Sequence, residues 1–230
     1  LADLKTNIHL FKYDSIHGTF NKRITQSKNS FDIGLGQIKI ISEINPSKLP
    51  WKKNNIDIIH DLDFRIDQWK DIFSFGKITK SILSYIDIVV GTEEEILATN
   101  IKSKNQVIIT DQQISSPKIK GNLSKAIYQI LDHGVKTLIV KSGEEGVTIY
   151  KSDGTSKKVD GFPVKVLNVL GAGDAFASGF IYGYLKGWDL IKSCRMGNAC
   201  GALIVLQPGC ANFMPSLNET LEFIKKNGGF

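Results

Sequence analysis

The chain has 230 residues, of which 42% are hydrophobic and 23% charged, the composition of an ordinary globular protein with room for one good core. Its net charge of +6 comes from scattered lysines and not from a dense basic stripe, so we expect no nucleic-acid partner. The sequence contains no apolar run long enough for a membrane span and no signal-peptide pattern, so we expect a cytoplasmic protein with no membrane partner. Three cysteines without metal-type spacing are expected to be reduced thiols: Cys194, Cys200 and Cys210.

The first part of the chain, residues 1–58, reads differently from the rest. A short helical pattern over 3–12 is followed by β-like runs between 22 and 41, which Gly and Asn residues separate. A turn is expected at Asn45-Pro46. We expect a small β-rich fragment here.

From residue 56 onward the pattern alternates between strands and helices. Strands are expected over 56–60, 86–91, 106–109, 137–141, 146–150 and 163–168. Helices are expected over 67–83, 93–98, 118–133, 174–186, 189–206 and 216–226. This alternation predicts a mostly parallel sheet covered by helices on both faces, in which ligands bind beyond the carboxyl ends of the strands.

Two polar motifs follow expected strands. Asp63 and Arg65 come directly after 56–60, either as a binding cluster or as a surface turn held by a local ion pair. In the first case Arg65 offers a fork of donors to phosphate or carboxylate oxygens. Thr92 follows 86–91 as an expected helix N-cap, with the acidic residues Glu93–Glu95 in the first turn.

The most informative stretch is a glycine-rich turn, Gly171-Ala172-Gly173, that opens directly into a helix with Asp174 at its start. Because the first N–H groups of a helix lack acceptors and lie at the positive end of its dipole, they suit an anion. A carboxylate base beside a cradle for a phosphoryl group is what a small-molecule kinase needs. The alternative is a plain turn with Asp174 as the N-cap.

The run from 168 to 180 resembles the signature of the ribokinase-like (PfkB) carbohydrate kinases. The segments 196–202 and 209–215 are similar to the 5-dehydro-2-deoxygluconokinase branch of inositol catabolism. The resemblance covers residues 57–230. It implies an α/β fold, a partial ribokinase-like three-layer αβα sheet, preceded by a small Rossmann-derived β-rich fragment.

The same resemblance implies a role for each motif. The loop at 141–146, otherwise a β-turn between two strands, would lie beside ATP, and the small residues around Asn198 either admit adenine or allow a tight helix–sheet contact. Thr92 stands where the family has Asn. The implied site residues are Asp174 as base, with Gly171, Ala172 and Gly173 as the anion hole; Lys141, Gly143, Gly146 and Asn198 beside ATP; Asp63 and Arg65 near the substrate; and Glu95, which would organise water on Mg²⁺.

Residues 1–58 resemble a different family, the NAD-binding domain of glyceraldehyde-3-phosphate dehydrogenase, through segments 1–10, 12–20 and 38–51. The dinucleotide loop and the Ser-Cys-Thr-Thr-Asn motif of that family are absent from the sequence, so we expect no dehydrogenase activity. We therefore expect two domains, 1–58 and 59–230. Because both families are cut in mid-domain, an artefactual join is favoured over a natural fusion.

The expected function is ATP-dependent phosphorylation of a sugar or sugar acid, 5-dehydro-2-deoxy-D-gluconate above all, with ATP and Mg²⁺ as cofactors. No counterpart of the family's sugar-binding region and lid precedes Asp61, so we expect weak activity or none from this chain. Two alternatives stay open: a non-catalytic nucleotide-binding fragment, and a glyceraldehyde-3-phosphate dehydrogenase-related NAD binder. The sequence leaves open whether the chain forms a homo-oligomer.

Overall fold

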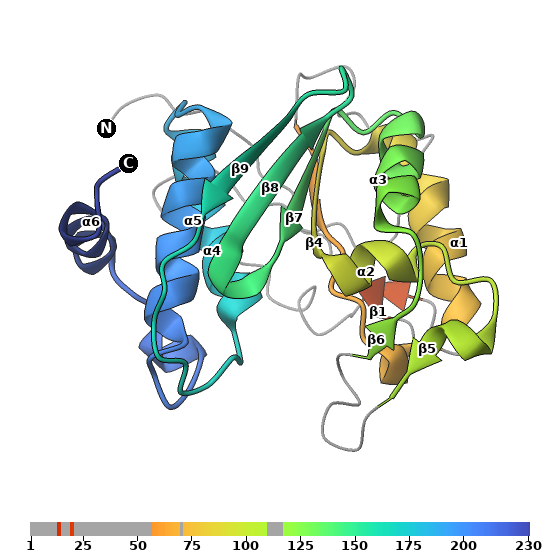
Figure 1. Ribbon diagram of the computed structural model, residues 1–230, viewed down its shortest axis with the longest axis horizontal. Helices are drawn as coiled ribbons and strands as arrows, with labels where there is room; N and C mark the ends of the chain where they lie inside the picture. The colour runs from red at the N-terminus through yellow and green to blue at the C-terminus, as the bar shows by residue number, and fades with distance from the viewer. Residues whose placement is uncertain (1–12, 15–18, 21–56, 70, 110–116) are drawn as a thin grey trace. The chain divides into compact units, whose positions relative to one another are not determined.

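The computed structural model describes residues 13–14, 19–20, 57–69, 71–109 and 117–230, which fall into two compact units (Figure 1). Unit 1 is Leu1–Ile139 with Lys151–Gly154, and unit 2 is Val140–Tyr150 with Thr155–Phe230. The helix expected over 3–12, the strands expected between 22 and 41 and the turn at 45–46 lie outside the described residues. Two short strands, β1 (Tyr13–Asp14) and β2 (Thr19–Phe20), pair antiparallel.

The predicted alternation of strand and helix is confirmed in unit 1. Strand β3 (Ile59–Asp61) pairs in parallel with β4 (Ile88–Thr92), in the register Ile59 opposite Ile88. Parallel strands need a long crossover, and helix α1 (Ile72–Ile82) with the turn η5 (Leu83–Tyr85) supplies it. Next to β4 in the sheet comes β7 (Thr137–Lys141), which begins in unit 1.

The helices of unit 1 begin where a polar side chain caps them. Helix α1 starts at 72 and not at 67, because the Asp71 carboxylate accepts from the N–H groups of Phe73 and Ser74, after a short turn η4 (Ile66–Gln68). Helix α2 (Glu93–Ala98) begins at Glu93 with Thr92 as its N-cap, as predicted.

Helix α3 (Leu123–Asp132) starts at 123 and not at 118, because Asn122 caps it and the preceding residues form β6 (Lys118–Ile119). Strand β6 pairs antiparallel with β5 (Val107–Ile108), which follows the turn η6 (Lys104–Gln106).

The core of unit 1 consists of large aliphatic and aromatic side chains from its strands and helices. Burial of each such side chain is worth roughly 1.5–3 kcal/mol, so these contacts hold the ends of β3 and β4 in place. Helix α2 packs against α3 and against β4. The fully buried side chains include Phe75, Leu83, Val89, Ile96, Ile130, Leu138 and Ile139.

Unit 2 contains an antiparallel hairpin that the sequence pattern did not predict. Strand β8 (Gly146–Lys151) follows β7 and the turn η7 (Gly143–Glu145) and pairs with β9 (Ser156–Asp160), Gly146 opposite Asp160. The expectation of a mostly parallel sheet is therefore wrong for this part, and the sheet is mixed. The strand expected over 163–168 does not form. The backbone N–H groups of Leu167 and Asn168 instead donate to the Val205 carbonyl.

Three helices complete unit 2: α4 (Ala172–Leu185), α5 (Leu190–Ile204) and α6 (Leu217–Lys226), with a short turn η8 (Ala211–Phe213). Figure 1 shows α5 between α6 and the strands β8 and β9, and α5 contacts both α6 and β9. Helices α4 and α5 touch through glycines, since a Cβ at Gly179 would lie 2.7 Å from the Met196 carbonyl oxygen. This contact packs the middle of α4 against the middle of α5.

No helix in the described part of the chain is long and apolar enough to cross a membrane.

Candidate nucleotide site

The N-terminus of α4 begins without a side-chain cap. Its first turn follows Gly171, whose backbone is left-handed (φ 83°, ψ 2°), and Asp174 lies exposed in that turn. Asp174 is therefore not the N-cap, and the plain capped turn is the wrong alternative. The other described α-helices each start at a capping side chain: Asp71, Thr92, Asn122, Asp189 and Ser216. The Ala172 N–H donates to the Val169 carbonyl at 3.2 Å, and no side chain of the N-cap residue binds the N–H groups that follow. Uncapped N–H groups at the start of a helix are suited to an anion.

The turn that leads into α4 is anchored to the end of α5. The Asn168 amide donates to the Pro208 carbonyl at 3.2 Å, and its side-chain oxygen accepts from the Leu170 N–H at 3.0 Å. A Cβ at Gly171 would lie 2.7 Å from the Cys210 Cβ, so both the positive φ and the neighbour require glycine there.

Lys141 reaches the glycine-rich turn from the end of β7. Its Nζ lies 3.4 Å from the position that a Cβ on Gly173 would occupy. Lys141, Gly173 and Asp174 all belong to unit 2, so one compact unit brings them together. The arrangement joins a cation, the outward N–H groups of a helix and an exposed carboxylate.

The loop at 141–146 is a single 3-10 turn between two strands. Gly143 is exposed, with φ 59° and no atom within 4 Å of its Cβ position, so a ligand can approach its backbone. Gly146 has a different setting, because a Cβ there would lie 2.2 Å from the Val159 carbonyl oxygen. The nucleotide role of both glycines remains a prediction.

Asn198 is buried on α5. Its side-chain nitrogen donates to the carbonyl oxygens of Val159 and Asp160, both at 3.0 Å. The amide thus binds the end of β9, and its proposed position beside adenine remains a prediction. Sequence reasoning missed Arg195, one turn earlier on the same helix. The available signal was a lone cation between the buried residues Cys194 and Met196.

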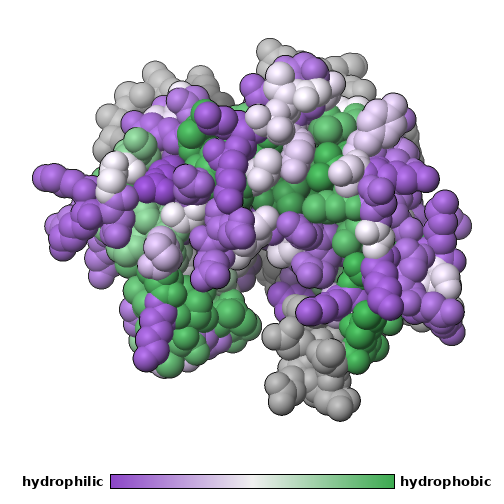
Figure 2. Space-filling model, viewed as in Figure 1, coloured by the Kyte–Doolittle hydropathy of each residue, from purple (hydrophilic) through white to green (hydrophobic). Residues whose placement is uncertain are grey.

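An exposed apolar surface lies next to the glycine-rich turn. It is formed by the segment before Gly171 and the segment after α5, which the hydrogen bonds to Val205 and Pro208 hold together. Figure 2 shows hydrophobic side chains gathered at this end of unit 2. A patch of this kind is typical of a binding surface for an apolar or aromatic group. The exposed side chains are Val166, Leu167, Val169, Leu170, Leu206, Phe213 and Met214.

Asp63 and Arg65 form a local ion pair in unit 1. Arg65 Nε lies 2.9 Å from Asp63 Oδ1, and both side chains are more than one-third exposed. Asp63 has φ 39°, an uncommon conformation for a residue with a side chain. This ion pair is the one expected if the segment is a surface turn held by a local pair. The role of Asp63 and Arg65 in substrate binding remains a prediction.

Glu95 belongs to the helix cap of α2. Its Oε2 accepts from the Thr92 N–H at 2.7 Å, while Thr92 Oγ1 accepts from the Glu95 N–H at 3.2 Å. The capping explanation therefore applies to Glu95 itself. No group of three potential metal ligands occurs among the described residues. A single carboxylate fits an outer-shell role toward a water-coordinated Mg²⁺, and that role remains a prediction.

Comparisons with known proteins identify the family. The fold is that of an α/β protein, and residues 49–217 match the pfkB family of carbohydrate kinases. The chain belongs to that family. Residues 1–62 match the NAD-binding domain of glyceraldehyde 3-phosphate dehydrogenase. Both resemblances noted in the sequence are thereby confirmed.

Two curated relatives are 5-dehydro-2-deoxygluconokinases. The one from Clostridium perfringens is 34% identical over 176 residues, 76% of this chain and 48% of the relative. The one from Clostridium beijerinckii is 35% identical over 175 residues, with the same coverage of 76% and 48%. This chain spans about half the length of the curated relatives it matches.

Solved structures agree on the ribokinase-like fold. A crystal structure from E. coli, of a protein described as a ribokinase II in complex with ATP and Mg²⁺, matches with a TM-score of 0.60 and 28% identity. The match covers 76% of this chain and 50% of that one. The predicted α/β class is confirmed.

Proposed function

We propose that this chain carries the ATP site and the catalytic base of a sugar-acid kinase that phosphorylates 5-dehydro-2-deoxygluconate in inositol catabolism. The observation that supports it is the approach of Lys141 to Gly173 at the start of α4, with Asp174 in the same turn. The names of the curated relatives supply the substrate.

The backbone at Gly171–Gly173 and the Lys141 ammonium act as the phosphate-binding elements. When bound, ATP supplies the phosphoryl group. The N–H groups at the start of α4 donate to phosphate oxygens, and Lys141 neutralises part of their charge. No side chain separates the Gly173 backbone from the Lys141 ammonium, so a phosphate bound at this turn would meet both the ammonium and the backbone N–H groups. The exposed apolar surface beside Gly171 offers a face for the adenine ring.

Asp174 acts as the general base. Its carboxylate is exposed in the first turn of α4, where a substrate hydroxyl can approach it. It accepts the hydroxyl proton as the oxygen attacks phosphorus. A positioned base of this kind contributes about 10²–10⁴-fold, and positioning by the surrounding residues supplies much of the remainder.

The proposal also assigns roles to three residues of unit 1. Arg65 and Asp63 bind the sugar acid, and Glu95 orders water on Mg²⁺ while it caps α2. The reaction takes place in the cytoplasm, and the boundary between the two family segments lies near residue 58. Because the chain spans about half of its relatives' length, a nucleotide-binding fragment without turnover is the second candidate.

The test is isothermal titration of the purified chain with Mg·ATP and with NAD, followed by an assay of ADP release with 5-dehydro-2-deoxygluconate. Lys141→Gln should weaken Mg·ATP binding, and Lys151→Gln, an exposed lysine at the end of β8, serves as the matched control. Binding of Mg·ATP without ADP release supports the fragment. Binding of NAD alone would contradict the kinase proposal.

A further inference from the structure

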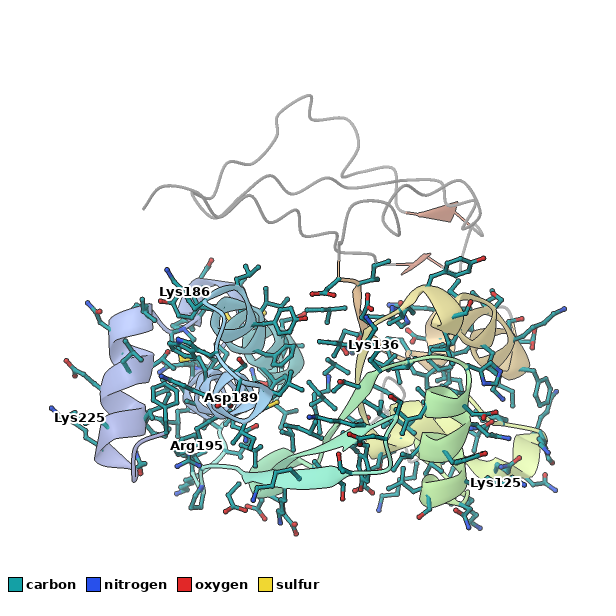
Figure 3. The ribbon with its side chains drawn as sticks, turned by 90° about the horizontal axis from the view of Figure 1, so that it is seen from above. Lys125, Lys136, Lys186, Asp189, Arg195 and Lys225 are labelled. Carbon is teal, nitrogen blue, oxygen red and sulfur yellow. The ribbon has the colours of Figure 1, made fainter. Side chains whose placement is uncertain are left out.

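Arg195 uses its guanidinium on backbone carbonyls from two separate segments. On one side, Nη1 donates to the carbonyls of Asp160 at 3.0 Å and Gly161 at 3.4 Å. On the other side, Nε donates to Gly229 at 3.2 Å and Nη2 to Asn227 at 3.0 Å. Figure 3 labels Arg195 on α5. The planar fork of arginine, with donors in fixed directions, can span both segments, whereas a lysine ammonium cannot.

The guanidinium is also fixed by stacking. Its central carbon lies 3.8 Å from the centre of the Phe162 ring, and burial lowers the pKa of Arg195. Asn198 lies three residues later on the same helix face and donates to Val159 and Asp160. Two side chains of α5 therefore bind three consecutive carbonyls at the end of β9.

Residues 159–161, at the end of β9 and just beyond it, form the support of the loop at 143–146. A Cβ at Gly146 would lie 2.2 Å from the Val159 oxygen, and one at Gly161 would lie 2.2 Å from the Glu144 oxygen. The Gly161 N–H donates to the Glu145 carbonyl at 3.2 Å. The two backbones touch with no intervening side chain, so a shift of 159–161 displaces the loop with it.

We propose that Arg195 is a positioning residue for the loop at 143–146, which it holds in place for its ligand through the end of β9. Arg195 acts through the backbone of 160–161 and contacts no ligand itself. The identity of that ligand as ATP rests on the function proposed above. The same side chain fastens the C-terminal segment at 227–229, so this segment and the loop share one anchor.

The test compares Arg195→Lys with Lys192→Gln in the full chain. Lys192 lies one turn earlier on α5 and packs over Trp188 and Phe230, at 4.3 and 4.8 Å from their ring centres. It shares the contact with the C-terminal segment, whereas the hydrogen bonds to the carbonyls of 160 and 161 come from Arg195. We expect Arg195→Lys to weaken Mg·ATP binding about tenfold and Lys192→Gln to change it less than about twofold.

Amide hydrogen exchange of the nucleotide-free chain separates positioning from general stability. We expect Arg195→Lys to speed exchange at Gly161, Glu145 and Gly146, while amides in α4 and α6 keep their protection. Unchanged exchange in this loop would overturn the proposal, as would a uniform loss of protection across unit 2. Arg195→Gln keeps donors for only one of the two segments, and its hydrogen exchange is compared with that of the original chain in the same way. Loss of the fold in both Arg195 variants would also overturn the proposal.

The two proposals fail in different ways. If the unaltered chain does not bind Mg·ATP, the proposed function falls, while the exchange comparison still decides whether Arg195 holds the loop. If the unaltered chain binds Mg·ATP and Arg195→Lys binds it equally well, the positioning role is refuted and the ATP site stands.

Discussion

The Lys141 ammonium lies 3.4 Å from the place where a Cβ on Gly173 would stand. A Cβ there would be in ordinary contact with the ammonium, so the ammonium lies directly beside the backbone of the first turn of α4. A phosphate bound at this turn would meet the Lys141 ammonium and the backbone N–H groups together. The relationship joins the end of β7 to the start of α4 within one compact unit.

Asp174→Asn should separate binding from transfer. The amide cannot accept the hydroxyl proton, so phosphoryl transfer should fall by about 10²–10⁴-fold. Mg·ATP affinity should stay equal or rise slightly, because a negative charge beside the phosphate site is removed. Titration and ADP release measure the two effects. Glu222→Gln, an exposed acid on α6, is the control, and a variant that transfers at the original rate would show that Asp174 is not the base.

Glu95 offers a way to separate its cap from its metal role. Glu95→Gln keeps an oxygen that accepts from the Thr92 N–H, so the unfolding midpoint should change little, while Glu95→Ala should lose about 1 kcal/mol of stability. If Glu95 orders Mg²⁺-bound water, Glu95→Gln should raise the Mg²⁺ concentration needed for ATP binding. Glu94→Gln is the control. If the original chain, Glu95→Gln and Glu94→Gln need the same Mg²⁺ concentration, Glu95 serves only as part of the helix cap.

The motif at the start of α4 could be predicted from sequence because its signal is local. Glycine, an expected helix and a carboxylate within four residues indicate an anion site without any distant contact. The resemblance pointed to Lys141 and Asn198 but not to their contacts, since Asn198 donates to residues 38 and 39 positions away. Arg195 was missed for the same reason, because its acceptors are backbone carbonyls that only the folded chain brings near.

The fold errors also have local physical causes. Strand β9 was missed because its residues are polar and mostly exposed, so no apolar alternation marks it. The valines at 164 and 166 suggested a strand, yet the N–H groups of Leu167 and Asn168 bind the carbonyl at the end of α5. Helices α1 and α3 begin five residues later in the chain than the sequence pattern predicts, because Asp71 and Asn122 cap them.

His60 should make the chain less stable in mild acid. It lies partly buried in β3, and burial lowers its pKa from 6.5 to about 4. In the unfolded chain His60 therefore binds a proton near pH 6.5, whereas in the folded chain it binds one only near pH 4. This difference lowers the free energy of unfolding as the pH falls through that window, by about 1–3 kcal/mol. Urea unfolding of the original chain and of His60→Gln measures it, and parallel pH profiles would contradict it.

The three cysteines should react at different rates. Burial raises the pKa of Cys194 to about 12 and also raises that of Cys200, whereas Cys210 is only partly buried. Because the thiolate is the reactive form, a thiol reagent at pH 8 should modify Cys210 alone in the folded chain and all three in urea. Cys210→Ser should abolish the fast reaction. Rapid modification of two or more thiols in the folded chain would refute this packing.

A titration of Gly173→Ala with Mg·ATP tests whether the backbone at Gly173 and the Lys141 ammonium together hold a phosphate. Alanine favours the helix by about 1 kcal/mol over glycine, so the variant should stay folded and should melt no lower than the original chain. Ser178→Ala, one turn later on α4, gains helix propensity without adding an atom beside Lys141. We expect Gly173→Ala to bind Mg·ATP at least about tenfold more weakly, because its methyl group lies against the ammonium, and Ser178→Ala to bind normally. Equal affinity in the two variants would contradict it.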